Sequence, residues 1–370
     1  NVVKKAHNDP HSYARFWQPI QAQLQKLYPN AKRVFVSLDG VYHQINLETL
    51  WHPEHKKYLG ELLDIRLVSS TKDLLKRGKN QPLAGGKKVQ LFGFPTYASA
   101  KQTTQKKKEI ENFFDTPSAT TKKQVRDLHP NGHITPLPGT KQEVEQIGQL
   151  LQQQGIAHQV HLAQQASEDR VKALKNPRIL HLATHGYFLQ DDKLLKGYRR
   201  QGLQWHWGGT DIKQYVENPL LRCGLLWAGA EATIKNEKRP QGGVASRFAG
   251  ENGLLTAQEA LNLNLDSTQL VVLSACETGK GKIQNGEGVY GLQRAFLSAG
   301  AKNVLMSLWK VDDVATQWFM QYFYESWAKD QLSSPDGSGD VRKAYHYAQQ
   351  KLRQDYPSPY YWGAFVLVGR

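Results

Sequence analysis

The second half of the chain alternates short apolar segments with segments whose apolar residues recur at helical spacing. Residues 179–184, 270–274 and 303–309 are three of the apolar segments, and each is flanked by polar or glycine-containing stretches. Strands that are separated by helices cannot pair through tight hairpins, so this pattern predicts a mostly parallel sheet with helices on both faces. We therefore expect an α/β fold.

Two sequence signals predict where helices begin in this region. Thr140-x-x-Glu143 and Thr256-x-x-Glu259 both have the spacing of a capping box. In a capping box the side chains of the first and fourth residues each accept a hydrogen bond from the other's backbone N–H. We therefore expect Thr140 and Thr256 to be the residues that cap two helices.

A different signal stands in the first third of the chain. Asp39-Gly40 separates two apolar runs, residues 33–38 and 41–46. Asp-Gly is a preferred dipeptide for the two-residue turn of a β-hairpin. We therefore expect the two runs to pair as antiparallel neighbours.

The length of 370 residues is enough for two domains. A polar stretch rich in Lys, Gln and Thr, residues 101–127, separates the early strands from the regular alternation. We therefore expect one part over residues 1–130, which ends in this polar insert, and a second part over residues 131–370. The start of the chain, without Met or a hydrophobic signal segment, is typical of a fragment or processed product of a longer chain.

Composition excludes several classes of protein. With 22% charged and 39% hydrophobic residues, the chain falls in the range of globular proteins. The longest uncharged apolar run, residues 362–369, is far shorter than the roughly 18 residues of a membrane helix, so we expect no membrane partner. The two cysteines, Cys223 and Cys276, exclude a disulfide scaffold and a four-thiolate zinc site. Such low cysteine usage favours a reducing compartment, and we expect a cytoplasmic protein.

The formal net charge of +15 has two interpretations. A basic surface can bind nucleic acid or another acidic partner. It can also be a solvated surface without a partner, and the mixture of lysines and acidic residues in the polar insert favours this in part. Nucleic acid therefore stays open as an indirect partner.

Two of the expected strands lead to reactive side chains. The run 179–184 is followed by His185-Gly186, and the run 270–274 is followed by Ala275-Cys276. The carboxyl ends of parallel strands lie at one edge of a sheet, so the imidazole and the thiol meet there if the two strands are neighbours. A cysteine nucleophile needs such an imidazole, as a base or as the cation that stabilises the thiolate. The alternative is a packed thiol and a structural histidine.

The other chemical candidates are weaker. Cys223 lies inside an apolar run and is expected to be a core residue, and His181 lies within its strand, where a structural role is expected. Gly286-x-Gly288-x-x-Gly291 matches a dinucleotide-binding pattern but does not directly follow a strand. No histidine cluster has metal-ligand spacing. We therefore expect neither a cofactor nor a metal ion.

Several longer runs resemble a known family. They are HLATHGYF at 181–188, VVLSACETGKG at 271–281, GEGVYGLQRAFLSAGAKNVLMSLWKVDD at 286–313, SLDGVYHQINLETL at 37–50, PLPGTKQEVEQI at 136–147 and YYWGAFVLVG at 360–369. Taken in their order along the chain, they are similar to the blocks of the CHAT domain. CHAT domains are caspase-like cysteine peptidases that are distantly similar to separase and often follow tetratricopeptide repeats in bacterial proteins.

The resemblance implies a fold and a set of roles. The fold would be a caspase-like three-layer α/β/α sandwich with a mostly parallel central sheet, preceded by a degenerate caspase-like half. His185 would be the histidine of a catalytic dyad and Cys276 its nucleophile. The backbone amides of Gly186 and Cys276 would form the oxyanion hole.

In caspase-like folds, the strand after the nucleophile strand leads into a loop that lines the substrate cleft, so the resemblance implies that this loop influences specificity. Asp312 and Asp313 lie in that loop, and a carboxylate there could pair with a Lys or Arg side chain of a substrate. The alternative is that these aspartates cap the helix that begins nearby. Glu277, next to the nucleophile, is a further acidic candidate.

The resemblance thus implies a cysteine endopeptidase that cuts proteins or peptides, with cleavage after a basic residue expected. Relatives of this kind are often latent until a partner or signal activates them, within bacterial defence or cell-death pathways. A tetratricopeptide-repeat segment in the parent chain, or a separate activating protein, is the expected partner. The alternative is a non-enzymatic caspase-like adaptor, open to a nucleic-acid-responsive role through its basic surface.

Overall fold

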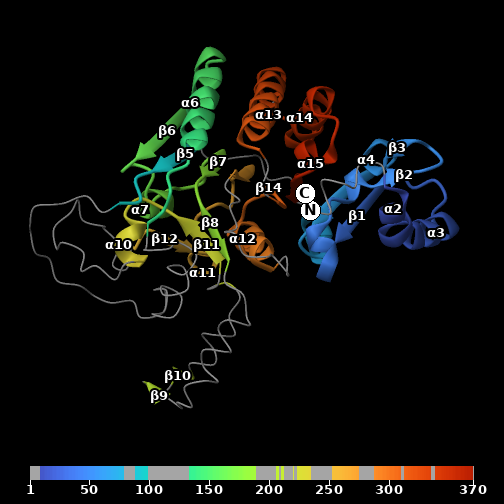
Figure 1. The fold of residues 1–370 in the computed structure, drawn as a ribbon, viewed down its shortest axis with the longest axis horizontal. Helices are drawn as coiled ribbons and strands as arrows, with labels where there is room; N and C mark the ends of the chain where they lie inside the picture. The colour runs from blue at the N-terminus through green and yellow to red at the C-terminus, as the bar shows by residue number, and fades with distance from the viewer. Residues whose placement is uncertain are drawn as a thin grey trace, which may run out of the picture.

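The computed structural model describes residues 9–78, 88–98, 133–188, 206–207, 210–211, 220, 223–234, 252–274, 287–309, 312–334 and 338–369. Its centre is an eight-stranded sheet with the strand order β1-β4-β15-β14-β13-β7-β5-β6 (Figure 1). These strands are β1 (Arg33–Ser37), β4 (Asp64–Val68), β5 (Val89–Pro95), β6 (His158–Ala163), β7 (Ile179–Ala183), β13 (Leu270–Leu273), β14 (Asn303–Ser307) and β15 (Phe365–Gly369).

Most of the strand pairs in this sheet are parallel. The five strands β14, β13, β7, β5 and β6 run in one direction. β15 is antiparallel to β14, and β4 and β1 follow the direction of β15. The prediction of a mostly parallel sheet is therefore confirmed, with a single reversal between β14 and β15.

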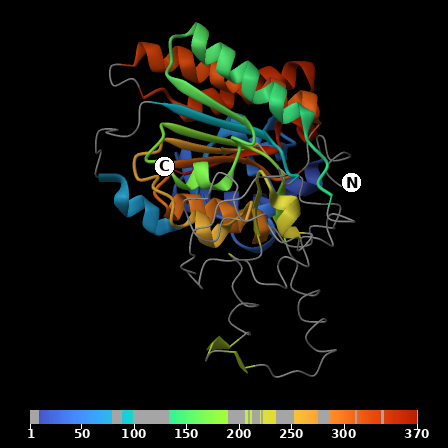
Figure 2. The same cartoon turned by 90° about the vertical axis from the view of Figure 1, so that its left-hand side faces the viewer.

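Helices cover both faces of the sheet, which gives three layers (Figure 2). On one face lie α6 (Pro138–Gln153), α13 (Asp313–Ser333) and α14 (Val341–Asp355), and on the other lie α7 (Glu168–Lys172), α11 (Ala257–Ala260) and α12 (Glu287–Ser298). Each face has its own cluster of buried apolar side chains. Burial on both sides explains why all five residues of β7 are buried. The three-layer α/β/α sandwich is confirmed.

A smaller antiparallel sheet lies beside α12. Its strands are β8 (Gly186–Phe188), β11 (Cys223–Leu226) and β12 (Leu254–Thr256), in the order β12-β11-β8, and α10 (Ala230–Ile234) follows β11. The remaining elements are α2 (Pro10–Phe16), α3 (Gln18–Leu27), η1 (Gly40–Gln44), η2 (Leu47–Thr49), β2 (Trp51–His52), β3 (Lys57–Tyr58), α4 (Leu59–Leu62), η3 (Thr71–Gly78), β9 (His206–Trp207), β10 (Thr210–Asp211) and α15 (Pro359–Trp362).

The prediction of a β-hairpin around Asp39-Gly40 was wrong. β1 pairs in parallel with β4, and the residues after the turn form the 3-10 helix η1. The carboxylate of Asp39 accepts a hydrogen bond from the Gly40 N–H and so caps η1. The local turn signal is overridden because β1 gains its hydrogen bonds from a strand of the central sheet.

One capping box is confirmed and the other was wrong. Thr256 and Glu259 exchange both hydrogen bonds of the motif at the start of α11. Thr140, in contrast, lies inside α6, which begins at Pro138. Its hydroxyl donates to the Leu137 carbonyl at 2.7 Å. A proline at the first helical position needs no N–H partner, so the helix can begin two residues before the threonine.

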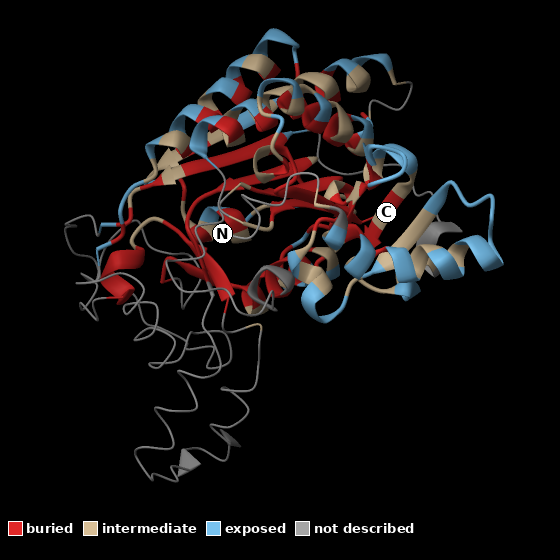
Figure 3. Ribbon diagram, turned by 45° about the vertical axis from the view of Figure 1, so that its right-hand side comes forward, coloured by how far each residue is buried: buried red, intermediate tan, exposed pale blue. Residues whose placement is uncertain are grey.

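The proposed division at residue 130 stays a prediction, but strands from both sides of it share one sheet. β1 and β4 lie at one end of the order, whereas β5 lies between β7 and β6. Figure 3 shows the inner strands of the central sheet buried and the outer faces of the helices exposed. The edge strand β1 and the helix α3 contain no buried residue. No helix in the described part of the chain has both the length and the apolar character to cross a membrane.

Candidate active site

The two strands that lead to His185 and Cys276 are neighbours in the sheet. β7 and β13 pair in parallel, and the hydrogen-bond ladder continues from the Ser274 N–H to the Leu182 carbonyl at 3.1 Å. Both strands end at the same edge, which is where open α/β sheets place their sites. Cys276 and Glu277 themselves lie outside the described residues. β7 and β13 are therefore neighbours, which is the arrangement required for the imidazole and the thiol to meet at this edge.

The imidazole of His185 is buried and held in one orientation. The residue is 3% exposed, and its Nε2 lies 2.7 Å from the backbone carbonyl of Thr135. A carbonyl oxygen can only accept a hydrogen bond, so Nε2 must carry a proton. In the neutral ring the lone pair is then on Nδ1, and the same carbonyl stabilises the ring when it is charged.

The backbone of His185 is held from a second side. Its N–H donates to the hydroxyl oxygen of Tyr97 at 3.4 Å, and its carbonyl accepts from the Leu226 N–H at 2.8 Å. The Tyr97 hydroxyl is 2.9 Å from the hydroxyl of Thr184, which donates to the Leu226 carbonyl. These bonds fix the turn between β7 and β8, because Tyr97 and Thr184 are both buried.

The pairing of β8 with β11 decides where the Gly186 N–H points. Gly186 stands opposite Leu225 in this antiparallel pair. The adjacent bond, from the Leu226 N–H to the His185 carbonyl, makes Gly186–Leu225 a pair without mutual hydrogen bonds. The Gly186 N–H is therefore directed away from β11. A donor with that direction, one residue after His185, has the chemistry of an oxyanion-hole amide.

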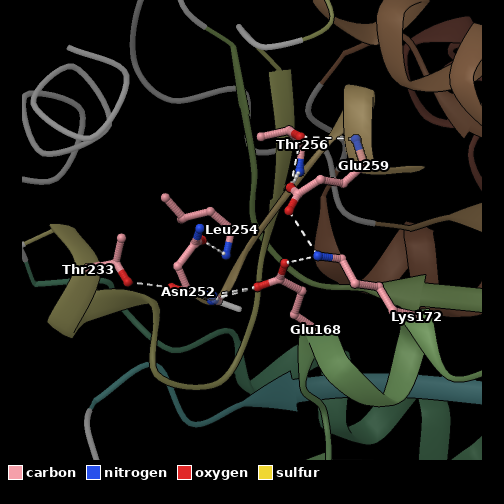
Figure 4. Close-up of polar contacts among 8 residues, drawn as sticks. Glu168, Lys172, Thr233, Asn252, Leu254, Thr256 and Glu259 are labelled. Carbon is pink, nitrogen blue, oxygen red and sulfur yellow. Dashed lines mark hydrogen bonds and ion pairs between the residues drawn. The ribbon is translucent and has the colours of Figure 1, made fainter. Parts of the chain in front are cut away.

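A buried ion network holds the small sheet in place (Figure 4). One carboxylate oxygen of Glu168 accepts from the N–H groups of Asn252 and Gly253, at 2.9 and 2.8 Å. The other oxygen lies 2.6 Å from the Lys172 ammonium. Glu168 is 2% exposed, so α7 and the segment that enters β12 are joined through a charge removed from water.

The same lysine also binds Glu259. Its ammonium is 2.9 Å from that carboxylate, whose second oxygen accepts from Thr256 as part of the capping box. Burial, together with the charge of Glu168, raises the pKa of Glu259 to about 7. Burial alone would lower the pKa of Lys172, but its two carboxylate neighbours raise it above the ordinary value. One ammonium therefore holds together α7, β12 and α11.

The two aspartates of the expected specificity loop have different positions. Asp312 caps α13, because its Oδ1 accepts from the N–H groups of Val314 and Ala315 at 3.0 and 3.3 Å. Asp313 is exposed in the first turn of the helix, beside the start of α6. A Cβ atom added to Gly139 would lie 3.6 Å from its Oδ2. The capping alternative therefore describes Asp312, whereas the carboxylate of Asp313 faces solvent.

Cys223 and His181 lie where the sequence placed them. Cys223 is fully buried in β11. His181 is fully buried in β7, with Nε2 at 3.0 Å from Glu143 and Nδ1 at 3.1 Å from the Tyr324 hydroxyl. Among the described residues, no group of three or more His, Cys, Asp or Glu side chains is arranged to hold a metal ion.

No motif in the sequence marks the groups that hold His185. Thr135 acts through its backbone carbonyl and Tyr97 through its hydroxyl. Neither residue belongs to a recognisable sequence motif. Both lie far from His185 in the sequence and reach it only through the order of strands β7, β5 and β6. These contacts could have been predicted only if the position of β5 in the sheet had been known.

Comparison with known proteins supports the family suggested by the sequence. A family model described as the CHAT domain matches residues 13–370. Tetratricopeptide repeat protein 28 of Mus musculus is 37% identical over 116 residues, which is 31% of this chain and 4% of that protein. Its Homo sapiens counterpart is 28% identical over 242 residues, 63% of this chain and 8% of that protein. The chain thus spans a small part of the length of these relatives.

Among solved structures, the Arg-specific cysteine proteinase gingipain R aligns over 99% of this chain and 69% of its own, with a TM-score of 0.44 and 11% sequence identity. The family match rests on the sequence alone and covers nearly the whole chain, including both β7 and β13. This chain belongs to the CHAT domain family.

Proposed function

We propose that this chain is a cysteine endopeptidase in which His185 and Cys276 form the catalytic dyad. The observation that carries the proposal is the parallel pairing of β7 with β13, because it brings the residues after both strands to one edge of the sheet. Membership of the CHAT family supports it, since the family is caspase-like.

The mechanism follows from the orientation of the imidazole. The Nε2–H donates to the Thr135 carbonyl, so Nδ1 is the atom that exchanges a proton with the thiol of Cys276. The thiolate attacks the peptide carbonyl and forms a C–S bond, and the amides of Gly186 and Cys276 stabilise the oxyanion. The imidazolium then protonates the departing amine as the C–N bond breaks.

The second half of the reaction regenerates the enzyme. Neutral His185 removes a proton from water, which attacks the thioester carbonyl. Collapse of this intermediate breaks the C–S bond and releases the carboxylic acid, and the thiolate and imidazolium are restored. The Thr135 carbonyl lowers the energy of the charged ring in both halves, because its dipole is directed at Nε2.

A mixed peptide library tests the proposal. Fragments produced by the wild-type chain and by the Cys276→Ala variant are identified by mass spectrometry. We expect cuts that disappear entirely in the variant, since it lacks the thiol that attacks the peptide carbonyl. Cuts that the variant makes at the wild-type rate would show that Cys276 is not the nucleophile.

For specificity, we propose Asp313 as the carboxylate that selects a basic residue before the cleaved bond, with Glu277 as a second acidic contact. Asp312 is less suited, because two backbone amides already occupy its Oδ1. The family's association with tetratricopeptide repeats, seen in the names of both relatives, further suggests that a repeat segment controls the activity of this site.

Asp313→Asn is expected to reduce the preference for Lys or Arg over uncharged residues by about tenfold, because a charge-assisted contact contributes roughly 1.5 kcal/mol. The ratio of kcat/KM for matched lysine and glutamine peptides measures the effect. Asp312→Asn is the control. It keeps a side-chain oxygen that can cap α13, since Asn and Asp are about equally good N-cap residues, and it is expected to leave that ratio unchanged. An unaltered ratio in Asp313→Asn would remove this residue from the pocket.

A further inference from the structure

Glu231 is a buried acid that binds a segment distant in the sequence. It lies in α10 and is 5% exposed. Its Oε1 accepts from the Ile134 N–H at 2.9 Å and lies 2.9 Å from Nδ1 of His133. A carboxylate in a dry environment binds such donors strongly, because little water competes for them. The carboxylate therefore fixes the backbone at Ile134 and also contacts the side chain of His133.

The contact between Glu231 and Ile134 is linked to the imidazole of His185 through one further residue, Thr135. Ile134 precedes Thr135, whose carbonyl accepts the hydrogen bond from His185 Nε2. The side chain of Thr135 itself is exposed and provides no anchor in the core. The position of that carbonyl consequently depends on the residue before it, which Glu231 holds.

The backbone of Glu231 reaches the same histidine by a second route. Its N–H donates to the Tyr97 carbonyl at 3.0 Å. The hydroxyl of Tyr97 accepts from the His185 N–H, and its ring lies 5.5 Å from the imidazole. One residue of α10 thus supports both the group that holds the His185 ring and the group that holds the His185 backbone.

We propose that Glu231 is a positioning residue for His185, which sets the tautomer and orientation of the imidazole through the carbonyl of Thr135. The role in catalysis rests on the proposed dyad, whereas the effect on the imidazole does not. An acceptor at Oε1 is the property that the geometry requires, since the contact that matters is the one to the Ile134 N–H. Glutamine retains that acceptor and alanine lacks it.

The first test observes the imidazole directly. NMR of the ¹⁵N-histidine-labelled Cys276→Ala chain, in which no thiolate holds the ring in its charged form, reports which ring nitrogen carries the proton, with the signal of His185 assigned through a His185→Gln variant. In this background, with Glu231 and with Glu231→Gln, we expect the single tautomer protonated at Nε2. In Glu231→Ala we expect both tautomers in exchange, because Thr135 is no longer fixed as the acceptor.

Glu48→Ala is a matched control. Glu48 is 8% exposed, and its carboxylate accepts from the Tyr345 hydroxyl at 2.7 Å, in a different part of the core. This variant loses a buried carboxylate and some stability, but it is expected to keep the wild-type tautomer of His185. A wild-type tautomer in folded Glu231→Ala, or the same tautomer mixture in Glu48→Ala, would overturn the proposal.

Kinetics then connect the imidazole to catalysis. With a peptide cleaved in a Cys276-dependent manner, Glu231→Ala is expected to lower kcat at least about tenfold with little change in KM, because misplacement of a catalytic group slows the chemical step. Glu231→Gln should recover most of that loss. A tautomer change without any Cys276-dependent cleavage in the wild type would overturn the endopeptidase and leave the positioning effect standing. A tautomer change with unaltered kcat would overturn the catalytic role of Glu231.

Discussion

His185→Ala is expected to lower kcat/KM for peptide cleavage by at least about a thousandfold. The variant loses the group that accepts the thiol proton and later protonates the departing amine, and positioned general acid–base groups contribute roughly 10²- to 10⁴-fold. The loss should appear mainly in kcat, since the imidazole acts on the reacting atoms. Initial rates with a peptide found in the library experiment measure it.

Because His185 is buried, loss of folding must be separated from loss of chemistry. Thermal unfolding of His185→Ala is compared with that of the wild type, and activity is measured well below both midpoints. His346→Ala, on the partly exposed surface of α14, is the control and is expected to cleave at the wild-type rate. Cleavage by folded His185→Ala within tenfold of the wild type would contradict the role of this residue as the base.

Lys172→Met is expected to lower the free energy of unfolding by about 3 kcal/mol. Removing one partner from a buried ion network leaves charges without compensation, which typically costs 3–5 kcal/mol. We expect a loss at the lower end of this range because the lysine side chain is 22% exposed, whereas the side chains of Glu168 and Glu259 are 2% and 3% exposed. Urea unfolding monitored by circular dichroism measures the change.

The same variant should show a characteristic dependence on pH. In the folded state, burial and the charge of Glu168 raise the pKa of Glu259 from its ordinary value of 4.5 to about 7. An acid with a raised pKa contributes stability below its unfolded value, and this contribution is lost as the pH rises through the folded value. Without the ammonium the folded pKa rises further, so the variant goes on losing stability above about pH 7, where the wild type no longer does. The destabilisation in Lys172→Met should therefore grow from about pH 7 upward.

Lys141→Met is the matched control for this experiment. Lys141 is 50% exposed and lies 3.9 Å from Glu145, one turn away on α6. Exposed pairs of this kind contribute at most about 0.5 kcal/mol. Two outcomes would contradict a stabilising role for the ion network around Lys172. One is an equal change in the free energy of unfolding for the two substitutions, and the other is a loss in Lys172→Met that does not depend on pH.

The sequence was sufficient for the parts of the fold that depend on hydrophobic periodicity. β7, β13 and β14 are buried on both faces, and strands of this kind read as continuous apolar runs that periodicity detects. The alternation of strands and helices predicted a parallel sheet in which both strands end at one edge, whereas the pairing of β7 with β13 was a condition that only the structure shows to be met.

Two features of the fold depended on pairing over long distances and could not be predicted. The turn at Asp39-Gly40 favours a hairpin locally, but β1 pairs with β4 instead. β5 crosses the proposed division of the chain to lie between β6 and β7. Nothing in the order of the strands along the sequence indicates either position.

The support around His185 was unpredictable for a different reason. Thr135 contributes a carbonyl, which every residue has, so no residue type marks it. Glu231 acts through the backbone of Ile134 and belongs to a short helix without a sequence signature. Tyr97 reaches His185 because of the position of β5. Such contacts follow from the assembled structure and not from a local pattern.

The most direct test of the dyad is the rate at which Cys276 is alkylated as a function of pH. A free thiol titrates near a pKa of about 8.5, and a neighbouring imidazolium lowers this value. We expect iodoacetamide to modify Cys276 with an apparent pKa well below 8.5 in the wild type and near 8.5 in His185→Ala, while the buried Cys223 stays unmodified. Superimposable profiles for the two proteins would contradict the pairing of His185 with Cys276.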